Sequence, residues 1–454
     1  MVAPQHLLTD DHMRQFITNG FLILNVTMPQ GFHECIYQRC EAIYESEGNP
    51  GNNILPRIPD LQQVFDHPTV IGAFSSILGP DYVMHVHRHG HRTPAQGKGG
   101  GWHKDSYWGY KKIRHHHPRW AMAFYYPQVV SEENGATRVV PGSHCYAARF
   151  DNLDEQSVPV TGDAGVIAIV HFDIWHRAAP NLTDCNRYMM KFQFHRMSEP
   201  IVPTWNTHDT AWQPTDPKRD VVWKEHWNWA MGRHTNSGAG NISSLVSQLS
   251  ATAEPDRLNA AYTLGAIGEL AVGPLIDTLK LDHEDARLAA TYGLATCGKP
   301  AVEALIQMLN HDNEQVRAHA AFALGDMGAQ AEHAVPALAK TLKDGSPFVR
   351  HHSAEALGTV AKTPDIAVPA LALALKDDDG QVRYNAAYSL SRFGSKAAYA
   401  VPALAMALQD ENRYTSGHAV TALRRIRTPE AVDTLLHWLE VTRWCPFTSK
   451  DSTF

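Results

Sequence analysis

Cysteine is scarce in this sequence, and the few cysteines are scattered. The 454 residues contain six of them, and no two form a CxxC pair. The six are Cys35, Cys40, Cys145, Cys185, Cys297 and Cys445. This spacing argues against a zinc ribbon or a disulfide framework and is typical of a reducing compartment.

Long apolar runs and strong charge of one sign are missing as well. No stretch approaches the roughly 18 apolar residues that a membrane span requires, and no basic segment followed by an apolar run marks a secretory signal. The formal net charge is −7 and no basic stripe is visible, so nucleic acid is not an expected partner and a nucleic-acid demethylase is disfavoured. We therefore expect a cytoplasmic protein that binds neither membranes nor nucleic acids.

What the sequence has is enough apolar material for folded domains and an excess of histidine. Hydrophobic residues make up 44% and charged residues 19% of the chain, which is typical of globular proteins. The length exceeds that of one ordinary core, so two or more domains are expected. Many of the 27 histidines lie between positions 85 and 117.

Residues 1–235 have the pattern of a β-rich domain. Short apolar runs of strand length are separated by segments with glycine or proline. These runs are 82–86, 121–126, 166–172 and 188–194. An opening helix is expected after Thr9 as N-cap, with Met13, Phe16 and Ile17 on one face. Many short strands favour an antiparallel sandwich or barrel.

An internal repeat dominates residues 241–440. An arginine recurs at intervals of 30, 30, 33 and 33 residues, with a small residue three positions later and a leucine seven positions later. The arginines are Arg257, Arg287, Arg317, Arg350 and Arg383; the leucines are Leu264, Leu294, Leu324, Leu357 and Leu390; the small residues are Ala260, Ala290, Ala320, Ser353 and Ala386. A sixth copy keeps Leu423 but has Ser416 in place of the arginine. Two-helix units of this length stack into a solenoid.

This pattern resembles HEAT-like repeats of the short kind noted in phycobilisome lyases. Such arrays mostly serve as binding surfaces or scaffolds, so a bilin-lyase role is disfavoured and a protein partner is a candidate. Residues 441–454 are expected to form a carboxy-terminal tail.

The residues that indicate chemistry lie in the first domain. His103 and Asp105 follow a glycine run in the segment 99–105, and residues i and i+2 of an extended segment share a face. His176 follows the strand-like run 166–172. Two imidazoles and one carboxylate form the facial triad of non-haem Fe(II) oxygenases, which leaves positions open for co-substrate and O2. Arg187, eleven residues after His176, has the planar guanidinium needed to bind the distal carboxylate of 2-oxoglutarate.

Over residues 5–200 the chain resembles the phytanoyl-CoA dioxygenase family. The motifs that carry the resemblance are Trp102-His103-Lys104-Asp105, the turn 134–144 (NGATRVVPGSH), Gly162-Asp163, and His176, Asn181 and Arg187 in this order. The resemblance implies a double-stranded β-helix, or jelly roll, with flanking helices. It also implies iron ligation by His103, Asp105 and His176, and binding of 2-oxoglutarate by Arg187.

One position departs from the family pattern. The family usually has a hydroxyl residue two positions after the second iron histidine, and this chain has Ala178. Thr137 is a candidate to replace that hydroxyl. Phe124 lies where the family often has an aromatic near 2-oxoglutarate, and a core position is an equal alternative. Because Asp105 is present, hydroxylation is favoured over halogenation.

Other conspicuous residues have two interpretations each. His85 and His87 are candidates to line the pocket, His87 as a cofactor contact, ahead of His89 and His91; the alternative is a polar strand edge. The run 115–117 (HHH) is expected to be a solvated loop. His171 competes with His176 as ligand, but the family register favours His176, and His144 is expected to be structural.

Aromatic residues gather in two places. Trp102, Tyr107, Trp108 and Tyr110 surround the iron motif, either to contact substrate or to pack in the core. Five tryptophans lie between 205 and 229, and they are expected to pack the domains together rather than cover the pocket.

The expected function is that of an Fe(II)/2-oxoglutarate-dependent dioxygenase. It would hydroxylate an aliphatic carbon of a small organic metabolite and release succinate and CO2. The same ligands also serve desaturation, cyclisation or epimerisation, and a scaffold with an inactive oxygenase domain is the alternative from another class.

Overall fold

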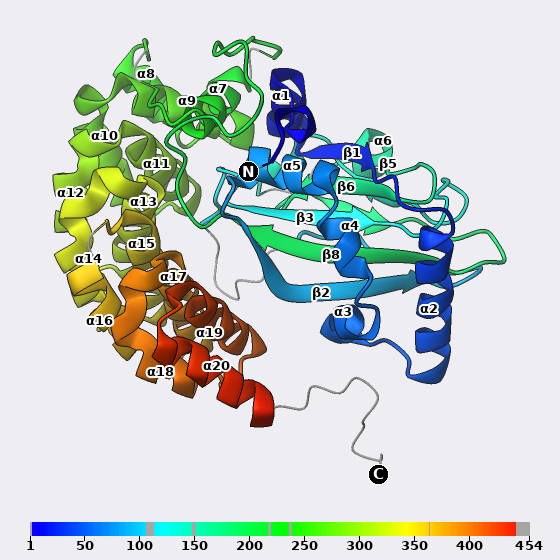
Figure 1. Ribbon diagram of the computed structural model, residues 1–454. Coiled ribbons are helices and arrows are strands. Elements are labelled where there is room, and N and C mark those ends of the chain that lie inside the picture. Colours follow the sequence, from blue (N-terminus) through cyan, green and yellow to red (C-terminus); the bar gives the residue numbers. More distant parts are fainter. Residues whose placement is uncertain are drawn as a thin grey trace. The chain divides into compact units, whose positions relative to one another are not determined.

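The computed structural model describes residues 2–105, 113–147, 151–216, 219–235, 238–362 and 364–441 (Figure 1). Within these ranges the chain divides into two compact units. The first contains residues up to 105 together with 116–211, and the second contains 113–115 together with 212–441. The predicted domain limits at 235 and 241 remain predictions. Tyr107, Trp108, Tyr110 and the tail beyond 441 lie outside the described residues.

Two antiparallel sheets form the first unit. The larger sheet has the order β1-β6-β3-β8-β2, and the smaller sheet has the order β5-β4-β7. The larger sheet contains β1 (Phe21–Asn25), β6 (Val166–His171), β3 (Trp120–Tyr125), β8 (Arg187–His195) and β2 (Val83–Thr93); the smaller sheet contains β5 (Val158–Pro159), β4 (Thr137–Val139) and β7 (His176–Ala178). The jelly-roll prediction is confirmed, and the four predicted strands are β2, β3, β6 and β8.

Helices accompany the sheets of this unit. They are α1 (Asp10–Asn19), α2 (Phe32–Ser46), α3 (Ile54–Arg57), α4 (Leu61–Phe65), α5 (Pro68–Leu78) and α6 (Leu153–Gln156). As predicted, Thr9 caps α1 by accepting a hydrogen bond from the backbone of His12, and Met13, Phe16 and Ile17 are buried. The cap supplies an acceptor for an amide that has no partner within the helix.

Strand β8 has two different faces. Phe192 stacks on Phe65 of α4, with ring centroids 4.3 Å apart, and Phe194 stacks on Phe74 of α5 at 4.0 Å. Alternate residues of a strand point to opposite faces, so the odd-numbered residues of β8 point away from these helices. The site described below lies on that second face.

The second unit is helical. Its helices are α7 (Asp220–Ala230), α8 (Ile242–Gln248), α9 (Glu254–Ile267), α10 (Glu269–Leu279), α11 (Glu284–Cys297), α12 (Val302–Met308), α13 (Glu314–Asp326), α14 (Val335–Thr341), α15 (Pro347–Val360), α16 (Pro364–Ala374), α17 (Gly380–Arg392), α18 (Val401–Ala407), α19 (Arg413–Ile426) and α20 (Pro429–Val441). From α9 to α20 they alternate as the two helices of successive repeats (Figure 1). No described helix is both long and apolar enough to cross a membrane.

The repeat residues have clear physical roles. All six leucines are fully buried. Arg317, Arg350 and Arg383 each form a two-pronged ion pair with an aspartate 27 residues later, which links one repeat to the next. The pairs are Arg317–Asp344, Arg350–Asp377 and Arg383–Asp410, with Nε to Oδ2 distances of 2.8, 2.7 and 2.7 Å. These three arginines thus hold successive repeats in register.

The expectation of a solvated loop at residues 115–117 is wrong. His116 and His117 are buried. Nδ1 of His115 lies 3.3 Å from Asp326, and Nε2 lies 2.8 Å from Glu355. The ring also stacks on Phe322 at 4.8 Å. Two carboxylate partners and an aromatic face compensate the loss of hydration, which the sequence pattern alone did not reveal.

The tryptophan-rich stretch contributes to both units. Trp205 donates from Nε1 to Asp10 in the first unit, at 2.7 Å. Trp223 and Trp227 are buried in the second unit. The prediction that this stretch packs the domains together stays a prediction.

Candidate active site

A short backbone bridge brings the two histidines together. His103 and His176 form an isolated antiparallel pair. The amide of His103 donates to the carbonyl of His176 at 3.1 Å, and the amide of His176 donates in return at 3.0 Å. Residues directly opposite each other in such a pair present their side chains on the same face, so both imidazoles lie together although the two residues are far apart in the chain.

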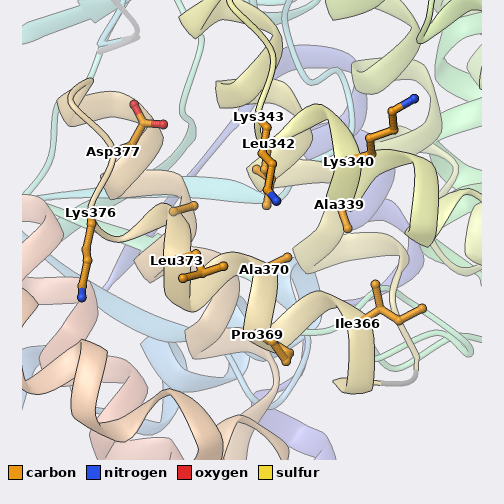
Figure 2. A pocket seen from close by; sticks show the side chains of 11 residues that line it. Ala339, Lys340, Leu342, Lys343, Ile366, Pro369, Ala370, Leu373, Lys376 and Asp377 are labelled. Atoms are coloured by element: carbon orange, nitrogen blue, oxygen red, sulfur yellow. The ribbon is translucent and has the colours of Figure 1, made fainter.

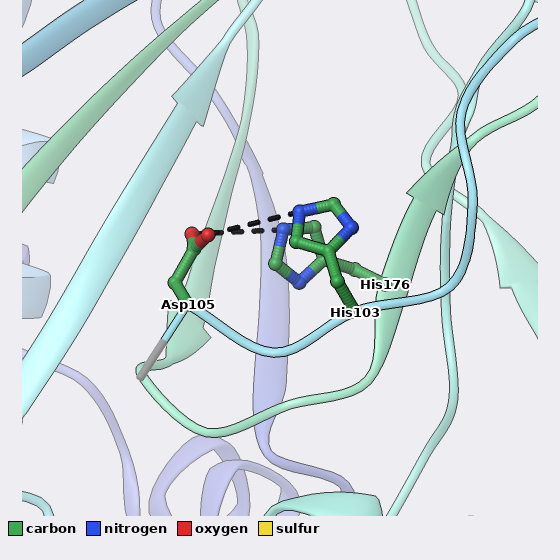
Figure 3. A group of neighbouring side chains, drawn as sticks. All are labelled: His103, Asp105 and His176. Carbon is green, nitrogen blue, oxygen red and sulfur yellow. Dashed lines mark ion pairs between the residues drawn. The ribbon is translucent and has the colours of Figure 1, made fainter. Parts of the chain in front are cut away.

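Asp105 completes the group, two residues after His103 (Figure 3). Nε2 of His103 lies 3.7 Å from Oδ1 of Asp105, and Nε2 of His176 lies 3.6 Å from Oδ2. One ligand atom from each residue lies within 4.8 Å of the others. Ligand atoms bound at about 2.0–2.2 Å to one metal are roughly 3–3.5 Å apart, so small side-chain adjustments suffice to bind an ion.

The other ring nitrogen of each histidine is tied to the backbone. Nδ1 of His103 lies 2.9 Å from the carbonyl of Gly101, and Nδ1 of His176 lies 3.1 Å from the carbonyl of Ile174. A carbonyl accepts only, so Nδ1 carries the proton and Nε2 keeps a free lone pair. This is the arrangement that orients and fixes histidine ligands of metals. The residues therefore fit a divalent metal.

The local electrostatics favour the protonation states in which His176 and Asp105 can bind a metal. Burial lowers the pKa of His176 to about 4, with Lys191 and His103 acting in the same direction and Asp105 against it. Burial alone would raise the pKa of Asp105, but the opposing effects of His176 and Lys191 hold it well below its usual value. At neutral pH the group offers a neutral imidazole and an ionised carboxylate, the forms that bind metal.

Lys191 also lies at this site, although no sequence motif predicts it. Its Nζ lies 2.6 Å from Oδ2 of Asp105, and both side chains are buried. Lys191 is four residues after Arg187 on β8, so both point to the same face. Lys191 is the one charged residue inside the apolar run of β8, and the two-residue period of a strand places it on the same face as Arg187. That period could have identified Lys191 from the sequence.

The group opens into a cavity of about 370 Å³ between the two sheets. Arg187, Met189 and Lys191 line it from β8, and Thr137, His176 and Ala178 line it from the smaller sheet. Arg187 is only 1% exposed. Its Nε and Nη2 donate to the carbonyl of Gly135, at 3.1 and 2.8 Å, so the Asn134–Gly135 turn fixes the guanidinium.

A hydroxyl residue, Thr137, lies beside Ala178, the position that departs from the family pattern. Thr137 of β4 pairs directly with Ala178 of β7. Its hydroxyl is buried and has no hydrogen-bond partner of good geometry among the described residues, although Tyr126 is close. A hydroxyl therefore faces the cavity from the strand next to the expected one.

The ranking of the histidines on β2 is reversed in the structure. His91 lines the cavity, whereas His85 and His87 are absent from the described lining. The β2–β8 register shifts between Met84 and Arg88, which takes His85 and His87 out of the pairing. The pairing resumes beyond this bulge, and His91 lies opposite Met189. The cofactor role predicted for His87 thus lacks support from its position.

Other candidates occupy structural or second-layer positions. Phe124 is fully buried and its ring lies 5.3 Å from the ring of His176, which suits both interpretations of this residue. His171 packs against His144 at 4.9 Å and does not belong to the metal-binding group. Asn181 donates to the backbone carbonyls of Pro94 and Cys185, so it holds the loop before β8 in place.

A second hollow, of about 590 Å³, lies on the helical unit between α14 and α16 (Figure 2). Its wall combines apolar residues such as Leu373 with the lysines at 340, 343 and 376. Among its lining residues there is one carboxylate, Asp377, and no histidine or cysteine. It therefore has no set of metal-binding or nucleophilic groups comparable to that of the first cavity.

Family models match both units. Residues 19–189 match phytanoyl-CoA dioxygenase (PhyH), and residues 302–380 and 368–444 match HEAT repeats. Enzymes of the first family depend on Fe(II) and 2-oxoglutarate, and the group of His103, Asp105 and His176 fits such a metal. The chain is thus similar to this oxygenase family over residues 19–189 and to HEAT repeats over residues 302–444.

Three solved structures that are similar to the chain each match less than half of it. A non-heme monooxygenase, the ThoJ–nickel complex, is 18% identical and has a TM-score of 0.34, over 46% of this chain and 93% of the other. The non-heme α-ketoglutarate-dependent carbocyclase SnoK from nogalamycin biosynthesis is 17% identical (TM-score 0.36; 44% and 88%). EctD from S. alaskensis with 2-oxoglutarate and 5-hydroxyectoine is 15% identical (TM-score 0.36; 44% and 80%).

Proposed function

We propose that this protein is an Fe(II)/2-oxoglutarate-dependent dioxygenase that hydroxylates an aliphatic carbon of a small organic metabolite. The observation that carries the proposal is the group of His103, Asp105 and His176, whose Nε2 and carboxylate atoms converge while both Nδ1 atoms are held by carbonyls. Fe(II) bound there would supply the oxidative decarboxylation of 2-oxoglutarate to succinate and CO2, coupled to substrate oxidation.

The protein's own residues have distinct tasks in this proposal. His103, Asp105 and His176 hold the ion on one side and leave the cavity side open for co-substrate and O2. Lys191 keeps the carboxylate of Asp105 ionised and fixed through its short hydrogen bond. The buried walls of β3 and β8 exclude water from one side of the reacting centre.

Co-substrate binding is assigned to Arg187 and Thr137. The guanidinium of Arg187 is buried in the cavity wall and already oriented by Gly135, so little side-chain entropy is lost when a carboxylate binds. The hydroxyl of Thr137 lies opposite Ala178 and replaces the hydroxyl that the family usually has there. Phe124 and His91 are second-layer and wall residues in this arrangement.

The test is an anaerobic titration of the full chain with Fe(II) and 2-oxoglutarate, followed by visible absorption. A metal-to-ligand charge-transfer band is expected for the wild type and is expected to be lost in Asp105→Ala. Absence of the band in a folded wild-type chain contradicts the proposal and favours a scaffold with an inactive oxygenase domain. Succinate release in the presence of candidate substrates then identifies the substrate class.

Product analysis separates hydroxylation from desaturation, cyclisation or epimerisation, because the metal ligands are the same for all of them. A product heavier than its substrate by one oxygen atom supports hydroxylation, and a product two hydrogens lighter supports desaturation. The protein partner of the HEAT repeats and the cytoplasmic location stay predictions.

A further inference from the structure

One repeat of the helical unit departs from the pattern of the others at a buried position. Five residues after the repeat arginine, four copies have an aromatic residue and the sixth has a threonine. The aromatic residues are Tyr262, Tyr292, Phe322 and Tyr388, and the threonine is Thr421. The copy on α15 has Glu355, whose side chain is 12% exposed. In four of the other repeats this position packs an aromatic ring. A buried carboxylate there costs folding free energy unless it has a hydrogen-bond or charged partner.

Two histidines accompany this carboxylate on the same helix. His351 and His352 precede Glu355 by four and three residues, the spacings at which helix side chains meet. One ligand atom from each of the three lies within 4.8 Å of the others. Because all three belong to one turn of α15, their mutual placement depends only on that helix. We call this group the helical cluster.

The imidazole of His352 has polar atoms that no described group satisfies. The residue is 5% exposed, and neither Nδ1 nor Nε2 has a hydrogen-bond partner among the described residues. Its ring packs between Phe348, at 4.8 Å, and Phe322, at 5.7 Å. Burial holds its pKa well below the usual value, so it is neutral and has a lone pair to donate. Buried polar groups normally have partners, and a metal ion would supply the one that the described residues do not.

Glu355 is available as an anion. Burial alone would raise its pKa, but the charge and hydrogen bond of His115, followed by His351, outweigh burial and lower the pKa to about 2. His115 contacts one carboxylate oxygen, Oε1, at 2.8 Å, which leaves the other oxygen for a further ligand. This contact resembles the outer-layer hydrogen bonds that orient carboxylate ligands of metals.

We propose that His351, His352 and Glu355 bind a divalent transition-metal ion of the zinc type, at a site separate from the oxygenase centre. Two imidazole nitrogens and one carboxylate oxygen form a donor set that Zn²⁺ binds with a fourth position left for water or another group. The ion would satisfy one of the two buried ring nitrogens of His352 and fix this turn of α15.

The test counts metal ions in the full-length chain. A variant with His103→Ala and Asp105→Ala removes the oxygenase centre, and the metal-stripped chain is titrated with Zn²⁺ by calorimetry. One equivalent is expected to bind to this background. Adding His352→Asn is expected to lower the affinity by more than about 100-fold, because loss of an outer-layer partner alone costs about 10–100-fold.

The repeats themselves supply matched controls. His352→Asn and Glu355→Tyr install residues found at the same repeat positions in Asn259, Asn385 and Tyr388, so the fold is expected to be kept. His319→Asn removes the buried histidine at the equivalent position of α13, whose Nδ1 already bonds Thr291 at 2.7 Å, and is expected to leave Zn²⁺ binding unchanged.

Thermal melting separates a lost site from a lost fold. Zn²⁺ is expected to raise the Tm of the background and of His319→Asn, and to leave the Tm of His352→Asn and of Glu355→Tyr unchanged. If the background binds no Zn²⁺, or if it binds equally well with and without His352→Asn, the proposal is overturned. If either substitution abolishes cooperative melting, Glu355→Gln, which keeps the shape of the side chain, is titrated with Zn²⁺ in its place. A lower Zn²⁺ affinity than that of the background supports the proposal, and an unchanged affinity overturns it.

Discussion

The chain contains two groups of two histidines and one carboxylate, and they are built in opposite ways. In the proposed oxygenase centre, formed by His103, Asp105 and His176, the candidate ligands come from distant segments joined by a backbone bridge. In the helical cluster, all three side chains come from one turn of α15. The first group is oriented by carbonyls behind each imidazole, whereas His352 in the second has no hydrogen-bond partner among the described residues.

Side-chain identity alone therefore does not define a metal centre. The first group is suitable for a catalytic metal for three reasons. Both of its imidazoles are oriented, it opens into a cavity, and a cationic residue that could bind a keto acid lies nearby. The second group is almost completely buried and lies outside the lining of both cavities described above. It suits an ion with a structural role. Four substitutions sharpen this comparison.

Asp105→Ala should have the largest effect. It removes the only carboxylate of the oxygenase centre, so Fe(II) binding and succinate production should fall more than about 100-fold, beyond the cost of losing an outer-layer partner. Anaerobic titration and succinate assay measure both. Asp184→Ala, at an exposed loop position, is the control and should retain activity. Equal activity in Asp105→Ala and wild type would refute the metal assignment.

Arg187→Met should raise the KM for 2-oxoglutarate by about 10–100-fold. The substitution keeps most of the buried volume but removes a charged hydrogen-bond donor, whose loss costs about 1.5–3 kcal/mol. The kcat at saturating co-substrate should change less than the KM. An unchanged KM in a chain that still binds Fe(II) would mean that another residue, Lys191 first, binds the distal carboxylate.

Asp344→Asn should destabilise the helical unit by about 1–3 kcal/mol at neutral pH. Burial opposes ionisation of Asp344, but hydrogen bonds from Arg317 and the amide of Ser346 lower its pKa. A lowered pKa contributes stability above the unfolded value of about 3.9, and this contribution is lost as the pH falls through the folded pKa. Denaturant unfolding at pH 7 and at about pH 2 should therefore show a difference in the free energy of unfolding between wild type and Asp344→Asn that narrows in acid.

Asp312→Asn is the control for this experiment. Asp312 is exposed and lies in a loop between two repeats, as Asp344 lies in the next such loop, and substitution of Asp312 removes a charge without breaking the Arg317–Asp344 pair. If the difference in the free energy of unfolding between wild type and Asp344→Asn does not narrow in acid, the lost interaction is not ionic.

Thr137→Val should have the smallest effect, a rise of about fivefold in the KM for 2-oxoglutarate, since one neutral hydrogen bond is worth about 1 kcal/mol. Ala178→Ser in the same chain should restore the KM, because the two residues face each other across β4 and β7. If Thr137→Val is neutral alone, the hydroxyl has no role in co-substrate binding.

Much of the architecture was predictable because it depends on local periodicity. The strand runs, the Thr9 cap and the arginine–leucine repeat appeared in the structure within a few residues of the predicted bounds, apart from β2, which extends to Thr93. Lys191 was missed although the alternation of β8 points to it. The reversed order of His87 and His91 was not predictable, because it depends on a bulge that only the pairing of β2 with β8 creates.

The helices, the strands and the candidate metal ligands could be predicted from the amino-acid sequence, since amphipathic period and motif spacing are encoded within short segments. Only the tertiary structure decided which side chains meet. The bridge between His103 and His176, the hydroxyl of Thr137 opposite Ala178 and the contact of His115 with Glu355 all join residues far apart in the chain. Such contacts depend on strand register and burial, which no local pattern specifies.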